Sequence, residues 1–361
     1  MTGVVDWGLG ERAAATVIAG LPGRGPAAPD PDRYRAAELE AACAEAIVAA
    51  AAYAGLGAVE HPPAPELLDR RAWARNALAT LAEAAQPLEA RLADDLGLPG
   101  PLGTIARRGA GAAIGTEVGL AAGYAAKRVL GQYDLALFGP PRPARLLFVA
   151  ENMDAARRNL EADREIFLRW VALHETTHVI QFERVEWLPA HMRSLAGRLV
   201  EGAAEGLDAA GLATIVRRLI RDPRELVRAL LRGELARTLA DPERRELLDR
   251  LQATMSVIEG HAEHVMDACG AEHGPALAQL RRRLDERRAR RGGLGELIAR
   301  LLGMDLKLRQ YEDGKAFCDA VVEEAGPEAL RLVWRSEADL PDLGELESPR
   351  RWLDRVAVAA A

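Results

Sequence analysis

The sequence has few aromatic residues and few cysteines, and each shortage excludes a class of protein. Phenylalanine, tryptophan and tyrosine make up only 4% of the 361 residues, which argues against an all-β sandwich or barrel. The three cysteines are far apart and form no Cys-x-x-Cys pair, so neither a disulfide framework nor a cysteine zinc knuckle is expected. A phosphate-binding Walker loop and a Gly-x-Ser-x-Gly nucleophile elbow are also missing, which removes two common kinds of active site.

What the sequence does contain is a large share of small apolar residues, above all alanine. Apolar residues make up 49% of the chain and, because few are aromatic, much of this share is alanine, the strongest helix former. The composition predicts a mainly α-helical fold with at most a short strand or small sheet. Residues 146–149 are the best strand candidate. Helices are expected over 35–59, 65–96 and 154–184, with a linker at 21–34.

Charge and apolar runs limit the partners. A net charge of −7 argues against nucleic acid, and the basic run at 281–291, which contains acids, is expected to be a solvated helix. Asp6 and Glu11 do not suit a signal peptide, so a cytoplasmic location is expected. Residues 109–126 are mostly Ala and Gly around Glu117, which argues against a membrane span. Their glycines recur every four residues, which predicts a helix packed closely on a neighbour.

The strongest motif is HETTH at 174–178, a His-Glu-x-x-His pattern inside an apolar stretch. Residues four apart lie one above the other on a helix, so both imidazoles can reach one cation, and neutral imidazole suits Zn²⁺. Glu175 is rotated by about 100° from His174, which suits a general base acting on a water at the metal. The motif predicts a zinc site with His174 and His178 as ligands and Glu175 as catalytic base.

A catalytic zinc site needs a third protein ligand, and residues 255–270 offer candidates. Glu259, Glu263 and Asp267 are spaced four apart, so they share one helix face and repel one another unless a cation lies there. A zinc ion bound by Glu259, with Glu263 hydrogen-bonded to a ligand histidine from behind, accounts for this arrangement. A solvated acidic stripe is the alternative.

HETTH followed downstream by Glu-Gly-x-Ala at 259–262 resembles the gluzincin metallopeptidases. The resemblance implies that His174, His178 and Glu259 bind zinc and that Glu175 is the base. The segment between the two motifs is longer than in many gluzincins. His261 and Glu263 therefore stay open as alternative third ligands.

More of the chain, over roughly residues 100–357, resembles a mainly actinobacterial family of zincin-like hydrolases. The matching stretches are VLGQYD (129–134), HETTHVIQFE (174–183), EGHAEHVMD (259–267), KLRQYEDGKAF (307–317) and LPDLGELESPRRWLDRV (340–356). Some members are associated with coenzyme F420 biosynthesis genes. The resemblance implies a zinc-binding, helix-rich, zincin-like fold and no particular substrate. On this basis we expect an N-terminal helical region over 1–140 and a metal-binding catalytic region over 141–361, packed together as one unit.

Two further elements offer partners for a reaction. Lys307, Tyr311 and Lys315 share one face of a predicted helix at 306–321, and the chain has only one other lysine. We expect Tyr311 to support an oxyanion, with a solvated face as the alternative. His264 is a candidate proton donor to a leaving amine, or else a structural histidine.

The sequence therefore predicts a zinc-dependent hydrolase acting on a peptide or a small amide. The alternative is a non-catalytic zincin-like scaffold or binding protein linked to coenzyme F420 metabolism. The intact Glu175 favours the hydrolase, because a structural zinc ion has no use for a general base.

Overall fold

The computed structural model describes residues 5–20, 34–95, 101–205, 242–270, 279–283 and 309–360. Almost all of the predicted linker at 21–34 and most of the basic run at 281–291 lie outside these ranges.

The only sheet in this part of the chain is small and central. Its strands are β1 (Pro65–Leu68), β2 (Gly131–Asp134) and β3 (Arg145–Val149), in the order β1-β3-β2. β3 runs parallel to β1 and antiparallel to β2, and its residues 146–149 are buried. The strand predicted at 146–149 and the mainly helical fold are both confirmed. A five-residue strand that lies between two neighbours is buried and needs only a short apolar run, which explains why β3 alone was evident in the sequence.

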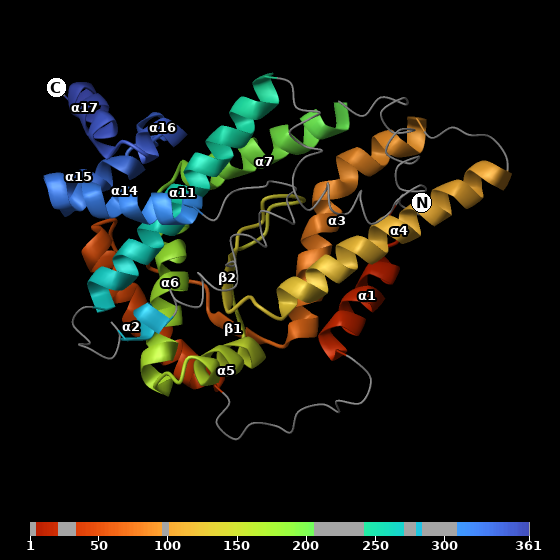
Figure 1. Cartoon of the computed structure of the whole chain (residues 1–361), viewed down its shortest axis with the longest axis horizontal. Coiled ribbons are helices and arrows are strands. Elements are labelled where there is room, and N and C mark those ends of the chain that lie inside the picture. The colour runs from red at the N-terminus through yellow and green to blue at the C-terminus, as the bar shows by residue number, and fades with distance from the viewer. Residues whose placement is uncertain are drawn as a thin grey trace.

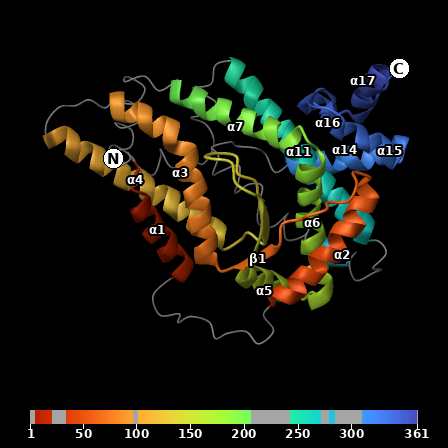
Figure 2. The ribbon, with the colours of Figure 1, turned by 180° about the vertical axis from the view of Figure 1, so that it is seen from behind.

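Helices lie to both sides of the strands (Figures 1 and 2). One group consists of α1 (Trp7–Ala19), α3 (Arg70–Asp95) and α4 (Pro101–Ala126), and the other includes α2 (Ala36–Ala54), α6 (Arg164–Arg184) and α11 (Pro242–Gly270). Successive side chains of β2 point to opposite faces of the sheet, so the strand contacts both groups of helices. Gln132 accepts a hydrogen bond from the Trp73 indole of α3, whereas Tyr133 stacks on Phe182 of α6.

The glycine-rich segment 109–126 forms most of α4 and packs directly on α1. A Cβ atom added to Gly115 would lie 2.1 Å from the Asp6 carbonyl oxygen, and one added to Gly119 would lie 2.1 Å from that of Gly10. The predicted close helix packing is confirmed, because only glycine lets the two backbones approach this far. None of the described helices combines the length and the apolar character that a membrane crossing requires.

Two helix predictions were wrong in their boundaries. The single helix expected over 154–184 is α5 (Ala150–Asn159) followed by α6, because Glu161 has a left-handed backbone (φ 48°) and the Asp163 carboxylate caps a new helix at the Glu165 and Ile166 N–H groups. The stretch expected to be helical from residue 65 begins instead with β1, and α3 starts at Arg70.

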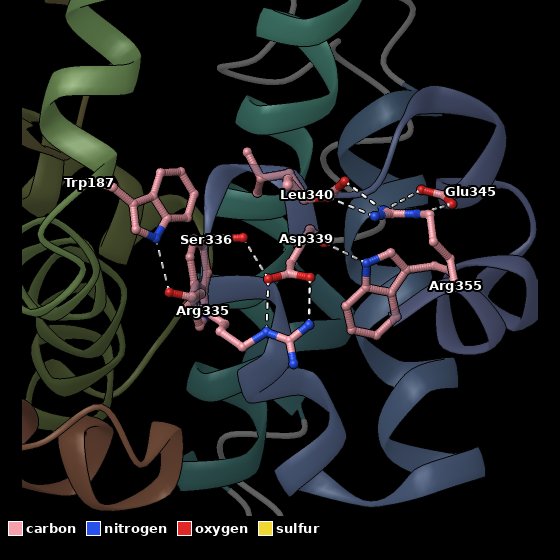
Figure 3. Close-up of polar contacts among 10 residues, drawn as sticks. Trp187, Arg335, Ser336, Asp339, Leu340, Glu345 and Arg355 are labelled. Carbon is pink, nitrogen blue, oxygen red and sulfur yellow. Dashed lines mark hydrogen bonds and ion pairs between the residues drawn. The ribbon is translucent and has the colours of Figure 1, made fainter. Parts of the chain in front are cut away.

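The C-terminal part folds into short elements that a polar cluster holds together (Figure 3). The elements that precede it are α7 (Leu188–Glu205) and α14 (Arg309–Ala325). After them come α15 (Pro327–Leu330), η2 (Arg331–Trp334), η3 (Glu337–Asp339), α16 (Leu343–Leu346) and α17 (Pro349–Ala360). The buried Asp339 carboxylate accepts hydrogen bonds from Arg335 and Ser336, and Arg355 forms two with Glu345. The Trp187 indole, between α6 and α7, donates to the Trp334 carbonyl oxygen at 3.1 Å and so ties this part to the HETTH helix.

α11 and α14 cross at two glycines. A Cβ atom added to Gly260 would lie 2.2 Å from the Gly314 carbonyl carbon, and one added to Gly314 would lie 2.0 Å from the Ser256 carbonyl oxygen. The glycine of the Glu-Gly-x-Ala motif thus allows backbone contact with α14 next to Glu259. The division of the chain near residue 140 stays a prediction; the sheet takes β1 and β2 from before that position and β3 from after it.

Candidate metal centre

His174 and His178 lie one turn apart near the middle of α6 and face the same way. Their Nε2 atoms are 3.3 Å apart, and the two rings meet edge to face with centroids 4.8 Å apart. This placement follows from the helix itself, since residues i and i+4 share a face.

Glu259 of α11 completes the cluster. Its Oε2 atom lies 3.5 Å from His174 Nε2 and 3.7 Å from His178 Nε2, and the ligand atoms of the three residues all lie within 4.8 Å of one another. The structure therefore brings together the three residues that the sequence singled out, from two helices far apart along the chain.

The cluster fits a zinc ion in both chemistry and size. Two imidazole nitrogens and one carboxylate oxygen form one of the three-ligand sets found at catalytic zinc. Tetrahedral zinc with bonds of about 2.0–2.1 Å holds its ligand atoms about 3.3–3.4 Å apart. The observed separations of 3.3, 3.5 and 3.7 Å approach that spacing.

The Glu259 carboxylate and the two imidazoles also interact electrostatically, and this interaction shifts the pKa of two of the three groups. Burial by itself would raise the pKa of Glu259, but the charges and hydrogen bonds of His178 and His174 hold it well below its usual range. Burial opposes protonation of His178, yet Glu259 and, more weakly, Glu175 raise the pKa of His178 to about 9. A divalent cation entering the cluster would replace a proton on His178, so its binding is coupled to pH.

Glu175 is buried beside the cluster, only 6% exposed, and strand β2 passes directly against it. A Cβ atom added to Gly131 would lie 2.6–2.7 Å from Cγ, Cδ and Oε1 of Glu175. Burial raises the pKa of Glu175, and Glu259 adds to this, while the two histidines lower it. A raised pKa brings a carboxylate closer to the range in which a general base is effective near neutral pH.

Each acid on the predicted acidic face of α11 meets a cationic partner. Beyond Glu259 with its histidines, Glu263 accepts from the Arg281 guanidinium at 2.9 Å. Asp267 pairs with Arg281 at 3.1 Å and with Lys315 at 3.2 Å. The hydrogen bond expected from Glu263 to a ligand histidine stays a prediction. The structure instead gives His178 Nδ1 a contact of 2.9 Å with Gln181 Oε1, a residue that sequence reasoning missed.

His264 lies in a separate polar network. Its Nε2 is 2.8 Å from the Tyr53 hydroxyl and its Nδ1 is 2.6 Å from Asp319 Oδ1, and Asp319 is also bonded to Lys315. Five residues along α11 turn a side chain by about 140°, so His264 and Glu259 point in different directions. The role of His264 as proton donor stays a prediction.

Of the remaining candidates, Tyr311 is described only in its backbone and Lys307 is not described at all. Tyr311 belongs to α14, but its side chain lies outside the described atoms, as does all of Lys307.

His261, considered above as a third ligand, packs its ring against Trp334, with centroids 5.1 Å apart, and its Nδ1 is 3.1 Å from Gln181 Nε2. The signal that could have found Gln181 is its place three residues after His178, where an apolar helix has little reason to carry an amide.

Comparison with known proteins adds two findings. A family model described as zincin-like metallopeptidase matches residues 5–353. The chain is also similar to the crystal structure of a candidate hydrolase with a novel fold from Chloroflexus aurantiacus, with 27% identity, a TM-score of 0.70, and coverage of 98% of this chain and 99% of that one. No curated protein matches the chain.

Proposed function

Because the chain belongs to the zincin-like metallopeptidase family, we propose that it is a zinc-dependent hydrolase acting on a peptide or amide bond. The observation that carries the proposal is the convergence of His174, His178 and Glu259 on one point beside a buried glutamate. When bound in such a set, a zinc ion polarises a carbonyl oxygen and lowers the pKa of water.

Glu175 is the proposed general base. Its carboxylate takes a proton from the water that attacks the carbonyl carbon, and the same proton then passes to the leaving nitrogen as the C–N bond breaks. Burial supports this role because it raises the pKa of Glu175 and so favours holding the proton between the two steps. Contact with β2 supports it further, because the backbone at Gly131 limits where the carboxylate can lie.

Strand β2 is our candidate for holding the substrate. β2 lies at an edge of the sheet and touches Glu175. β3, which contains the strand predicted from the sequence at 146–149, is paired on both sides and has no free edge. An extended peptide can pair with the backbone of an exposed edge strand. Substrate bound along β2 would therefore run beside the proposed base.

Tyr311 remains our candidate for oxyanion support. It precedes Gly314 by three residues, and the crossing of Gly314 with Gly260 brings that part of α14 alongside Glu259. Tyr311→Phe is expected to lower kcat and leave the zinc content unchanged.

The decisive experiment compares wild type with Glu175→Gln. We expect about one zinc per chain in both. Digestion of a peptide library, followed by mass spectrometry, should be slower by about 10²–10⁴-fold in the variant. Glu165→Gln, an exposed acid at the start of the same helix, is the matched control and should behave as wild type.

Each failure has a distinct meaning. A wild-type chain without bound metal would remove the metal centre from the proposal. Turnover that persists in Glu175→Gln would remove Glu175 as the base. Zinc held by four protein ligands, with no turnover of any library peptide, would favour the scaffold instead of the hydrolase.

A further inference from the structure

Gln181 is a fully buried amide between the two helices of the metal centre. It lies on α6, three residues after His178, and its side chain is 0% exposed. Its Oε1 is 2.9 Å from His178 Nδ1, and its Nε2 is 2.9 Å from the Ile258 carbonyl oxygen and 3.1 Å from His261 Nδ1. Both N–H groups and the oxygen of the amide therefore have partners, and the two N–H groups face α11.

These contacts fix which way the amide points. The Ile258 carbonyl oxygen can only accept a hydrogen bond, so the amide nitrogen must face it. The amide oxygen then faces His178, and since that oxygen can only accept, the proton of the neutral His178 ring must be on Nδ1. The lone pair of the ring is left on Nε2, the atom 3.7 Å from Glu259 Oε2.

We propose that Gln181 is a positioning residue that fixes the tautomer and the orientation of His178 for metal binding. The inference rests on the proposed zinc site and names the group that prepares one of its ligands. Ring nitrogens that bind metals do so as lone pairs, and the partner of the other nitrogen sets which tautomer is present.

His261 holds the amide from the far side. Its Nδ1 accepts the second N–H of Gln181, and its ring packs edge-on against Trp334 of η2. Trp334 is in turn bonded through its carbonyl oxygen to the Trp187 indole, part of the cluster drawn in Figure 3. The path from the C-terminal elements to His178 thus runs through the buried side chains of Trp334, His261 and Gln181.

The test measures zinc affinity of the full chain by competition with a fluorescent chelator, a readout independent of activity. Gln181→Met keeps the length of the side chain but removes the acceptor and both donors, and it should weaken zinc binding by about 10–100-fold. Gln181→Glu keeps an acceptor toward His178 Nδ1, so it should bind zinc more tightly than Gln181→Met does. Gln252→Met changes a second buried glutamine, which lies on α11; this variant is the matched control and should bind as wild type.

A second measurement needs no variant. In ¹⁵N-labelled, zinc-loaded wild type, long-range ¹H–¹⁵N spectra should show His178 with a protonated Nδ1 and a metal-bound Nε2. Metal on Nδ1 would overturn the inference, and so would wild-type zinc affinity in Gln181→Met or equal losses in the Met and Glu variants. Each of these outcomes leaves the zinc site standing, whereas a wild type that binds no zinc would overturn the proposed function itself.

Discussion

At the scale of single residues, Gly131 is the position where one added carbon should matter most. A Cβ atom there would overlap the end of the Glu175 side chain, at 2.6–2.7 Å, and touch no backbone so closely. The flexible side chain, not the fold, should therefore move. We expect Gly131→Ala to keep its zinc and its unfolding temperature but to lose about 10²-fold in kcat/KM, the cost of misplacing a catalytic group by about 1 Å.

Metal analysis, thermal unfolding and peptide hydrolysis of the same preparation check this prediction. Gly197→Ala on α7 is the control, because nothing lies within 4 Å of the added atom and helix propensity improves. Full activity in Gly131→Ala would mean that β2 does not constrain Glu175.

Glu38 should make folding stability depend on pH in the acid range. Its carboxylate bonds to Arg164 and Arg35, both at 2.7 Å, and these contacts lower the pKa of Glu38 to about 2. A carboxyl group with a lowered pKa in the folded state stabilises the protein above its unfolded pKa of about 4.3. That contribution is lost as the pH falls from there through about 2.

Glu38→Gln should therefore be less stable than wild type at pH 7, by about 0.5–1 kcal/mol for a pair that solvent partly screens. The difference in free energy of unfolding, measured in urea, should shrink steadily below about pH 4.3. A difference that stays constant down to pH 2 would show that the effect is packing and not charge.

The candidate site could be predicted residue by residue only as far as helix periodicity reaches. Spacing alone placed His174 and His178 on one face and Glu259 and Glu263 on another, and these faces do meet. Periodicity does not say what lies opposite a face. The partner of His264 is Asp319 of α14, which depends on how helices pack, so no single segment of sequence contains that pair. Gln181 lies three residues after His178 on the same helix, but its contacts with Ile258 and His261 of α11 depend on the same packing.

At the scale of elements, long helices and the buried strand β3 were predictable, whereas the other two strands of the sheet were not. α2 and α3 follow from alanine-rich stretches, whereas β1 and β2 have four residues each, too few to display an alternating pattern. The break between α5 and α6 depends on Glu161 and Asp163, which are ordinary residues in a helix until the backbone turns there. Local turn chemistry, not composition, ended the predicted long helix.

The α11–α14 crossing is the element contact that a single methyl group should break. A Cβ atom at Gly260 would lie 2.2 Å from the carbonyl carbon of Gly314, and backbone cannot move aside as a side chain can. Gly260→Ala should cost at least about 1–3 kcal/mol of stability, the usual range for overpacking. It should also weaken zinc binding, because Glu259 is the adjacent residue.

Urea unfolding and chelator competition on Gly260→Ala check both effects. Gly197→Ala again serves as control, since it adds the same atom to a helix with nothing within 4 Å. A variant as stable as wild type would mean that the two helices are not in contact at this point.

At the scale of the whole molecule, the metal centre joins parts of the chain that are distant in sequence. Its ligands come from α6 and α11, its base touches β2, and the sheet that contains β2 also takes a strand from each side of residue 140. A ligand that binds only the folded state stabilises it by mass action. Zinc should therefore act on the unfolding of the whole chain and not on the local site alone.

We expect chelation to lower the unfolding midpoint. Zinc at 100 times its Kd contributes about 2.7 kcal/mol, which corresponds to roughly 3–4 °C for a chain of this size. The shift should shrink as the pH falls, because Glu259 raises the pKa of His178 to about 9 and protons compete with the metal for its Nε2. Scanning calorimetry with and without a chelator at pH 8 and pH 6 measures both effects. The double variant His174→Ala, His178→Ala should unfold at the same temperature with and without the chelator, and an undiminished shift in it would place the stabilising metal elsewhere in the protein.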